Sequence, residues 1–273
     1  MSSVIIFIEK GFKMTNFERI TSKDNEIIRL AATLVSSAKK RREEGMFLLD
    51  GLRLCRDAEQ NGFEAECFIV GDSAYEKFKN EAESLAKNAK RAVIVPDSLI
   101  SKISDTVSPQ GFLSICKFKA NDFKINSNGL YIALENVQDP SNLGAISRSA
   151  EAFAFDGIIL SSNGCDPYSP KSLRASMGAL LRIPVMVVSR FADFLKDTEL
   201  DTYAAVVKNG ENVREQNFRK GSVMVVGNEA NGLTEECVSA CKKSVTIPMK
   251  GKAESLNVAT ASSILMWEMS DAE

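Results

Sequence analysis

Short apolar runs alternate with helical stretches along most of this 273-residue chain, and this alternation limits the possible folds more than any other feature. In the carboxy-terminal half, apolar runs predict strands at residues 130–134, 157–160, 185–188, 202–207, 222–226 and 244–247. Helical spacing follows at 145–153, 170–180, 233–241 and 256–268. Runs such as 185–188 (VMVV) are apolar at every position, as in parallel strands covered on both faces. The pattern predicts an α/β fold with a mostly parallel sheet.

The amino-terminal part shows the same alternation on a smaller scale. It predicts helices at 27–40, 52–60, 75–86 and after Pro96, and strands at 46–49, 67–70, 92–95 and 112–116. Between the two parts, residues 117–129 (KFKANDFKINSNG) mix charge, Asn and Gly, which is typical of a linker. We therefore expect a smaller α/β domain over 15–116, a linker over 117–129 and a second domain over 130–273.

Residues 1–13 are expected to stand apart from these domains. The apolar run at 4–8 is far too short to span a bilayer, and it follows no basic segment. Met14 precedes a more ordinary polar start, so we interpret residues 1–13 as a disordered or misassigned leader. We expect a cytoplasmic protein without a membrane segment.

Histidine is absent, and the six cysteines form no CxxC pair. Zinc fingers, zinc hydrolases and Ser-His or Cys-His catalytic units therefore lack a required residue type, and we expect no metal site. The cysteines are expected to be reduced and mostly buried. A net charge of −2 argues against a protein that coats nucleic acid with a strongly basic surface, but it is compatible with a local basic site.

Three loops that follow predicted strands contain unusual groups of polar residues. They span 135–144, which leads to Arg148, then 227–233 and 247–257. In parallel sheets, ligands bind beyond the carboxyl ends of the strands, so all three loops are expected to gather at one end of the sheet. Singly, each loop is also typical of an ordinary turn and helix cap, with Ser141 or Asn142 capping the first helix. Arg148, expected in the first turn of that helix, opposes the helix dipole, which favours a functional role.

Together, the three loops resemble the signature motifs of the SpoU (TrmH-type) branch of the SPOUT RNA ribose 2′-O-methyltransferases. The matching segments are NxGxxxR at Asn142, Gly144 and Arg148, GNExxGL at 227–233, and IPM followed by ESLNVA at 254–259. The stretch from Asp166 to Gly178 also fits the middle region of that family. The similarity covers about residues 128–270.

The amino-terminal part is similar, more loosely, to the ribosomal-protein-like substrate-binding domain of the same family. The segments that carry this similarity are 20–22, the basic run Lys39, Lys40, Arg41 and Arg42, then 47–51 and 109–111. Asp50 stands where a glutamate is common. Basic runs are more often solvated helix surface, but beside such a domain we expect these four side chains to contact RNA phosphates.

The resemblance implies a deep trefoil knot and S-adenosylmethionine as the cofactor. Main-chain groups of Gly227, Ile247 and Leu256 are expected to hold its adenosine. Arg148 is expected to bind a phosphate and orient the ribose, because a guanidinium stays protonated at neutral pH and is a poor general base; the proton acceptor stays open. The further polar partners of the nucleotide are expected to be Asn142, Glu229, Ser255 and Asn257.

The family also implies a homodimer. Residues 258–267 are apolar on more than one helix face, which favours a subunit interface in which Arg148 serves the neighbouring subunit's cofactor. The predicted activity is methyl transfer to a ribose 2′-hydroxyl of structured RNA, with rRNA favoured over tRNA. One alternative is a non-catalytic RNA-binding or ribosome-assembly factor, which has no reason to keep all the polar site residues. Another is a base-modifying methyltransferase, which the NxGxxxR and SLN patterns disfavour.

Overall fold

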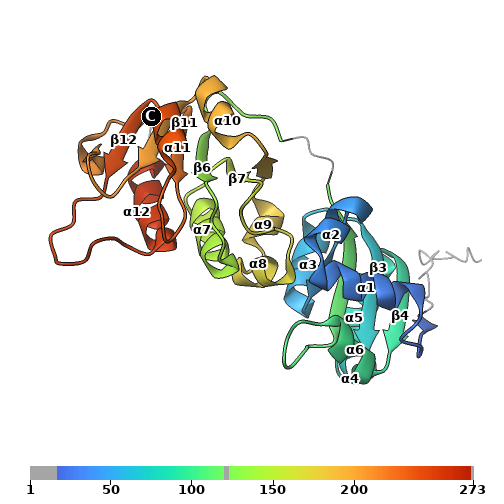
Figure 1. The fold of residues 1–273 in the computed structure, drawn as a ribbon. Coiled ribbons are helices and arrows are strands. Elements are labelled where there is room, and N and C mark those ends of the chain that lie inside the picture. Colours follow the sequence, from blue (N-terminus) through green and yellow to red (C-terminus); the bar gives the residue numbers. More distant parts are fainter. Residues whose placement is uncertain (1–16, 120–122, 272–273) are drawn as a thin grey trace, which may run out of the picture.

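The computed structural model describes residues 17–119 and 123–271, which form two α/β domains (Figure 1). The first contains a five-stranded sheet and the second a seven-stranded sheet. The expected leader at 1–13 lies outside the described residues. Within the described part of the chain, no helix is both long enough and apolar enough to cross a membrane.

The first sheet is mixed, with the strand order β1-β4-β3-β5-β2. Strands β1, β4 and β3 run parallel, whereas β5 pairs antiparallel with both β3 and β2. Its strands are β1 (Glu18–Arg19), β2 (Met46–Asp50), β3 (Ala65–Gly71), β4 (Ala89–Val95) and β5 (Phe112–Lys117). Its helices are α1 (Glu26–Ser36), α2 (Ala38–Glu44), α3 (Leu52–Gln60), α4 (Asp72–Lys77), α5 (Lys79–Lys87) and α6 (Asp97–Ile103). Helices α1 and α6 bury apolar side chains on one face of the sheet, and α3 and α5 do so on the other.

One predicted helix of the first domain is in fact two. The stretch 27–40 was expected to be continuous, but Ser37 has the extended angles φ −129° and ψ 109° and ends α1. Its backbone N–H donates to the Thr33 carbonyl, and its hydroxyl accepts from the Lys40 N–H at the start of α2. A serine that competes for backbone hydrogen bonds therefore breaks the helix. This break turns α2 toward the second domain (Figure 1).

The second sheet confirms the predicted parallel α/β fold, because all its strand pairs are parallel. The order is β10-β12-β9-β11-β6-β7-β8. The strands are β6 (Leu130–Leu134), β7 (Gly157–Ser161), β8 (Val185–Val188), β9 (Asp201–Ala205), β10 (Glu211–Asn212), β11 (Ser222–Val226) and β12 (Lys243–Thr246). The helices are α7 (Pro140–Ala152), α8 (Pro170–Ala175), α9 (Ala179–Arg182), α10 (Phe191–Asp197), α11 (Glu235–Ala240) and α12 (Val258–Ser270). Helices α7 and α12 cover one face, and α10 and α11 cover the other.

The predicted helix at 170–180 is also divided. Met177 and Gly178 have positive φ values of 51° and 87°, which end the α8 segment and begin the short α9. The glycine is required here for a second reason, because an added Cβ would overlap the carboxylate of Asp57 in the first domain. The two domains therefore pack closely at this turn.

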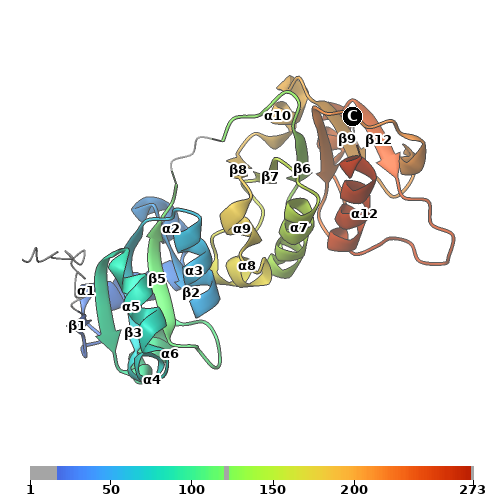
Figure 2. The same cartoon turned by 180° about the vertical axis from the view of Figure 1, so that it is seen from behind.

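The domains meet where α8 and α9 approach β2 and α3, as both views show (Figures 1 and 2). Tyr168 packs with Phe47 of the first domain and with Phe118, which directly follows β5, at ring-centroid distances of 5.0 and 4.6 Å. Ion pairs also cross this junction, among them Arg174 with Asp105. A shared aromatic cluster and crossing ion pairs fix the orientation of the first domain relative to the second.

Candidate active site

A cavity of about 280 Å³ opens at the carboxyl ends of β9, β11 and β12. Its wall combines the buried side chains of Val226, Val245 and Leu265 with the backbone of the loops that follow these strands. Both the 227–233 loop and the 247–257 loop contribute to the lining, as the strand-end argument predicted. The sequence-predicted residues among the lining are Gly227, Ile247, Leu256, Glu229 and Ser255.

Gly227 is enclosed by its own loop. An added Cβ would overlap the backbone of Gly232 and Leu233. The loop closes on itself through two backbone hydrogen bonds between Asn228 and Gly232, of 3.0 and 2.9 Å. Gly232 has a φ of +68°, which favours glycine. The GNExxG pattern is therefore the sequence of a tight turn whose backbone forms part of the cavity wall.

The three motif loops are joined by a chain of side-chain hydrogen bonds. Nδ2 of Asn142 donates to Oε1 of Glu229 at 2.9 Å, and Nδ2 of Asn257 donates to Oδ1 of Asn142 at 3.1 Å. Asn257 also caps α12, because its Oδ1 accepts the N–H of Ala259 at 2.9 Å. Asn142 and Asn257 thus support the rim of the cavity through Glu229, although they are not among the described residues that line it.

Glu229 is held as a carboxylate. Desolvation is the largest single effect and raises its pKa. Hydrogen bonds from Asn142 and from the backbone N–H groups of Asp139 and Gln138 outweigh it together, so the pKa of Glu229 lies below its usual value. The rim of the cavity therefore carries a negative charge at neutral pH.

Arg148 does not lie where the sequence pattern suggested. Helix α7 begins at Pro140 with Asp139 as its cap, because the Asp139 carboxylate accepts the Ser141 N–H at 2.8 Å. The proline fixes the first helical position earlier than expected. Arg148 is therefore two turns into the helix, and the helix-dipole argument for its function was wrong. Its side chain is exposed, does not line the cavity, and makes no ion pair within residues 17–119 and 123–271.

The basic run on α2 is divided by the structure. Lys39, Lys40 and Arg42 are exposed, and both lysines lie within 4 Å of the Glu43 carboxylate. Arg41 is only 4% exposed. Its Nε donates to the Asp166 carboxylate at 2.7 Å, and its Nη1 donates to the backbone carbonyl of Leu34 at 2.5 Å. The expectation that all four basic side chains contact RNA is wrong for Arg41. Its guanidinium pairs with Asp166 of the second domain and is buried in the domain junction.

Glu135, the first residue of the 135–144 loop, was not among the predicted site residues, and the structure shows it buried. Glu135, 6% exposed at the end of β6, accepts hydrogen bonds from the N–H and hydroxyl of Thr234 at 2.8 and 2.7 Å, and from the Cys237 thiol at 3.0 Å. These bonds fix the exit of the 227–233 loop. An acidic residue directly after a fully apolar strand is the signal that could have found it.

The cysteines behave as predicted. All six are free, four are buried, and burial raises the pKa of Cys55 and Cys67 to about 12. Among the described residues, no group of three His, Cys, Asp or Glu side chains is arranged to hold a metal.

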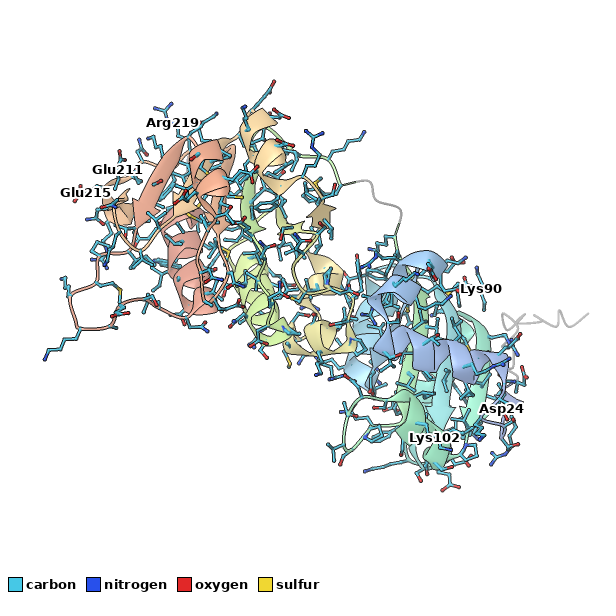
Figure 3. The ribbon with its side chains drawn as sticks, in the orientation of Figure 1. Asp24, Lys90, Lys102, Glu211, Glu215 and Arg219 are labelled. Atoms are coloured by element: carbon cyan, nitrogen blue, oxygen red, sulfur yellow. The ribbon has the colours of Figure 1, made fainter. Side chains whose placement is uncertain are left out.

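A second cavity, of about 480 Å³, lies at the opposite, amino-terminal edge of the sheet. Its charged lining is mixed, and Glu211, Glu215 and Arg219 lie near one another at the outer end of the domain (Figure 3). None of the motif residues reaches it. The polar motifs therefore converge on the carboxyl edge alone.

Two parts of the chain match known protein families. Residues 129–267 match the SpoU rRNA Methylase family, and residues 25–114 match the MRM3-like substrate binding domain. An uncharacterized tRNA/rRNA methyltransferase of Synechocystis is 30% identical, over 91% of this chain and 92% of that protein. The 23S rRNA (guanosine(2553)-2′-O)-methyltransferase RlmP of Bacillus subtilis is 26% identical, over 85% and 91% of the two chains. The crystal structure of an AdoMet-bound rRNA methyltransferase from Sinorhizobium meliloti superposes with a TM-score of 0.79 at 28% identity, covering 93% and 97%.

Proposed function

The chain belongs to the SpoU rRNA methylase family, and from that membership we propose a residue-level account of its reaction. The protein is an S-adenosylmethionine-dependent RNA methyltransferase that acts on a ribose 2′-hydroxyl of rRNA. The observation that carries the assignment of its site is the convergence of Gly227, Glu229 and Leu256 on one cavity. We assign the substrate-binding domain to residues 15–116, the linker to 117–129 and the catalytic domain to 130–273.

The cavity fits the proposed cofactor chemically. Apolar side chains and backbone groups together suit an adenosine, which has an apolar face and a polar edge. The carboxylates of Glu229 and Glu254 lie in the lining and favour a positive charge such as a sulfonium. We assign the adenosine contacts to the main chain of Gly227, Ile247 and Leu256. The trefoil knot is part of this proposal, supported by the path of 247–257, which leaves the interior strand β12, lines the cavity and enters α12.

The chain's own residues have to orient the ribose and the cofactor. When bound, S-adenosylmethionine supplies an activated methyl group, so catalysis needs in-line positioning and removal of the hydroxyl proton. Arg148 holds a phosphate beside the target ribose through its planar guanidinium, which remains charged and is no proton acceptor. Asn142 and Asn257 keep Glu229 in place, and Ser255 offers a hydroxyl at the rim.

The exposed side chains of α2 supply the proposed RNA contacts outside the pocket. Lys39, Lys40 and Arg42 are all exposed and lie on the amino-terminal domain. Their neutralisation of phosphates would release counterions and make RNA binding salt-dependent. The rRNA substrate is supported by the rRNA methyltransferases among the relatives. Free, buried cysteines support a reducing compartment, and we assign the protein to the cytoplasm.

A homodimer is also proposed. Trp267 on α12 is 60% exposed and packs edge-to-face with Phe153, directly after α7, at 5.6 Å. An exposed tryptophan beside the half-buried Phe153 and the partly exposed Ile264 is typical of a subunit interface. Because Arg148 lies outside the cavity of its own chain, we assign it to the site of the partner subunit.

The proposal is tested with the Arg148→Ala variant. Methyl transfer to rRNA should be lost while S-adenosylmethionine still binds, as measured by calorimetry. Methylation that persists at a near-normal rate would refute the assignment of Arg148. An intact protein that binds rRNA but transfers no methyl group would instead indicate a ribosome-assembly factor.

A further inference from the structure

Arg182, in the short helix α9, contacts two carboxylates from different parts of the molecule. Its Nε donates to Oε1 of Glu151, and its Nη2 donates to Oε2 of the same carboxylate at 2.9 Å. Its Nη1 donates to Oδ2 of Asp57, in the first domain, at 3.1 Å. The guanidinium therefore takes both oxygens of Glu151 and is anchored from its other side by Asp57.

Glu151 lies three residues after Arg148 on α7. Residues at this spacing are neighbours on a helix surface, and opposite charges there pair with each other. Glu151 is the one acidic residue of α7, and it is therefore the carboxylate on this helix that could pair with Arg148. In the structure it is bound to Arg182 instead, and within the described residues Arg148 has no carboxylate partner.

The surroundings of Arg182 hold it in this position. Its side chain is 30% exposed, and its hydrogen bond with Glu151 is the largest of the effects that raise its pKa. Gly178 leaves room for the contact, because a side chain there would overlap both Asp57 Oδ2 and Arg182 Nη1. Residues from three segments far apart in the sequence thus surround the guanidinium of Arg182. These segments are α3, α7 and the turn before α9.

We propose that Arg182 is a positioning residue for the methyl-transfer reaction, which binds Glu151 and thereby keeps the guanidinium of Arg148 free for an RNA phosphate. This rests on the proposed function of Arg148. Without Arg182, the released carboxylate pairs with Arg148 and repels the incoming phosphate. The contact with Asp57 makes this arrangement depend on a correctly docked substrate-binding domain.

A double-mutant cycle separates this role from a merely structural one. The variants are Arg182→Gln, Glu151→Gln and the pair together, in the full chain. The substrate is rRNA isolated from a strain of the source organism that lacks the gene, with labelled S-adenosylmethionine. We expect Arg182→Gln to lower kcat/KM for rRNA about three- to tenfold when Glu151 is present. In the Glu151→Gln background, the same substitution should cause no further loss, because no carboxylate is left to capture Arg148.

Further measurements identify the cause of any loss. The affinity for S-adenosylmethionine, measured by calorimetry, and the melting temperature show whether each variant is folded. The kcat/KM values of two variants are compared only at equal cofactor occupancy. Arg190→Gln is the matched control, since Arg190 forms an ion pair with Asp193 on α10 of the same domain. It should leave kcat/KM unaltered.

The possible outcomes are distinct. An equal loss from Arg182→Gln in both backgrounds, or no loss in either, would overturn the proposal for Arg182, even if Arg148→Ala abolishes activity. Full activity of Arg148→Ala would refute the proposed role of Arg148, and this inference with it, while leaving the methyltransferase activity established. Loss confined to the background that contains Glu151 would support both.

Discussion

Asn142 and Glu229 are 87 residues apart in the sequence, yet Nδ2 of Asn142 donates a 2.9 Å hydrogen bond to Oε1 of Glu229. This bond links the first turn of α7 to the loop after β11. Asn257 extends it to the last loop through Oδ1 of the same amide. One asparagine therefore uses both ends of its amide to join three motifs, and its side-chain identity is constrained more than a simple helix cap would require.

The Asn142→Asp variant tests this constraint. It replaces the donor that faces Glu229 by a second carboxylate oxygen, so two negative charges meet at neutral pH. We expect the affinity for S-adenosylmethionine to fall about tenfold at pH 7.5. Because like charges raise the pKa of the pair, the loss should shrink as the pH falls toward 5 and one proton binds. Calorimetry at both pH values measures this, and a pH-independent loss would contradict it.

Gly227 should be essential for cofactor binding. A Cβ at this position would overlap the backbone of Gly232 and Leu233, so Gly227→Ala must displace the loop that lines the cavity. We expect S-adenosylmethionine binding to become undetectable by calorimetry. Gly251→Ala is a matched control, because nothing lies within 4 Å of the added Cβ and the residue is exposed. Equal binding by both variants would place the cofactor elsewhere.

The ion pair between Arg41 and Asp166 should stabilise the docked arrangement of the domains. The two side chains are 5% and 17% exposed, and Asp166→Asn leaves a buried guanidinium without its counter-charge. We expect the free energy of unfolding in urea to fall by about 2 kcal/mol. Asp193→Asn, which removes a partner from the exposed pair with Arg190, should leave it nearly unchanged. Equal effects of the two substitutions would show that the domain junction contributes little.

The exposed basic residues of α2 should act on RNA affinity alone. Replacing Lys39, Lys40 and Arg42 together by glutamine should weaken rRNA binding and reduce the slope of log K against log salt by about 2. Arg41→Gln should leave the slope unaltered, because its guanidinium already pairs with Asp166. Filter binding at several salt concentrations measures both. A reduced slope for Arg41→Gln would show that this side chain leaves the junction to meet RNA.

Trp267 should control subunit association. The indole is 60% exposed beside Phe153, and Trp267→Glu would place a charge in the proposed interface. We expect this variant to sediment as a monomer and to lose methyl transfer, because Arg148 would no longer reach a partner's cofactor. A monomeric wild-type protein with full activity would contradict the dimer and the assignment of Arg148 across it.

The sequence predicted the centre of the second sheet well because β6, β7 and β11 are mostly apolar and fully buried. Runs such as 130–134 and 222–226 are fully buried, as expected for strands of a sheet that is covered by helices on both faces. The two-residue strand β10 has no such pattern and was missed. The ends of the helices were predicted less accurately than the strands. A helix end depends on a single side chain, such as Ser37 or Asp139, that hydrogen-bonds to the backbone there.

The candidate site was predictable in part. The lining by Gly227, Ile247 and Leu256 followed from loops at the ends of parallel strands and from the family resemblance. The burial of Arg41 did not, because its partner Asp166 is 125 residues away and no local pattern marks the pair. The ion pair between Arg182 and Glu151 could not be predicted from the sequence for the same reason.

The most direct test of the proposed function measures the transfer of a methyl group to rRNA. The purified full chain should be incubated with methyl-labelled S-adenosylmethionine and rRNA from a strain that lacks the gene, and the label should then be mapped by alkaline hydrolysis and nuclease digestion. We predict label in an alkali-resistant dinucleotide, which only a 2′-O-methylated ribose produces, and its absence with Gly227→Ala. Label on a base, or no label with folded wild-type protein that binds both substrates, would contradict a ribose methyltransferase built on this cavity.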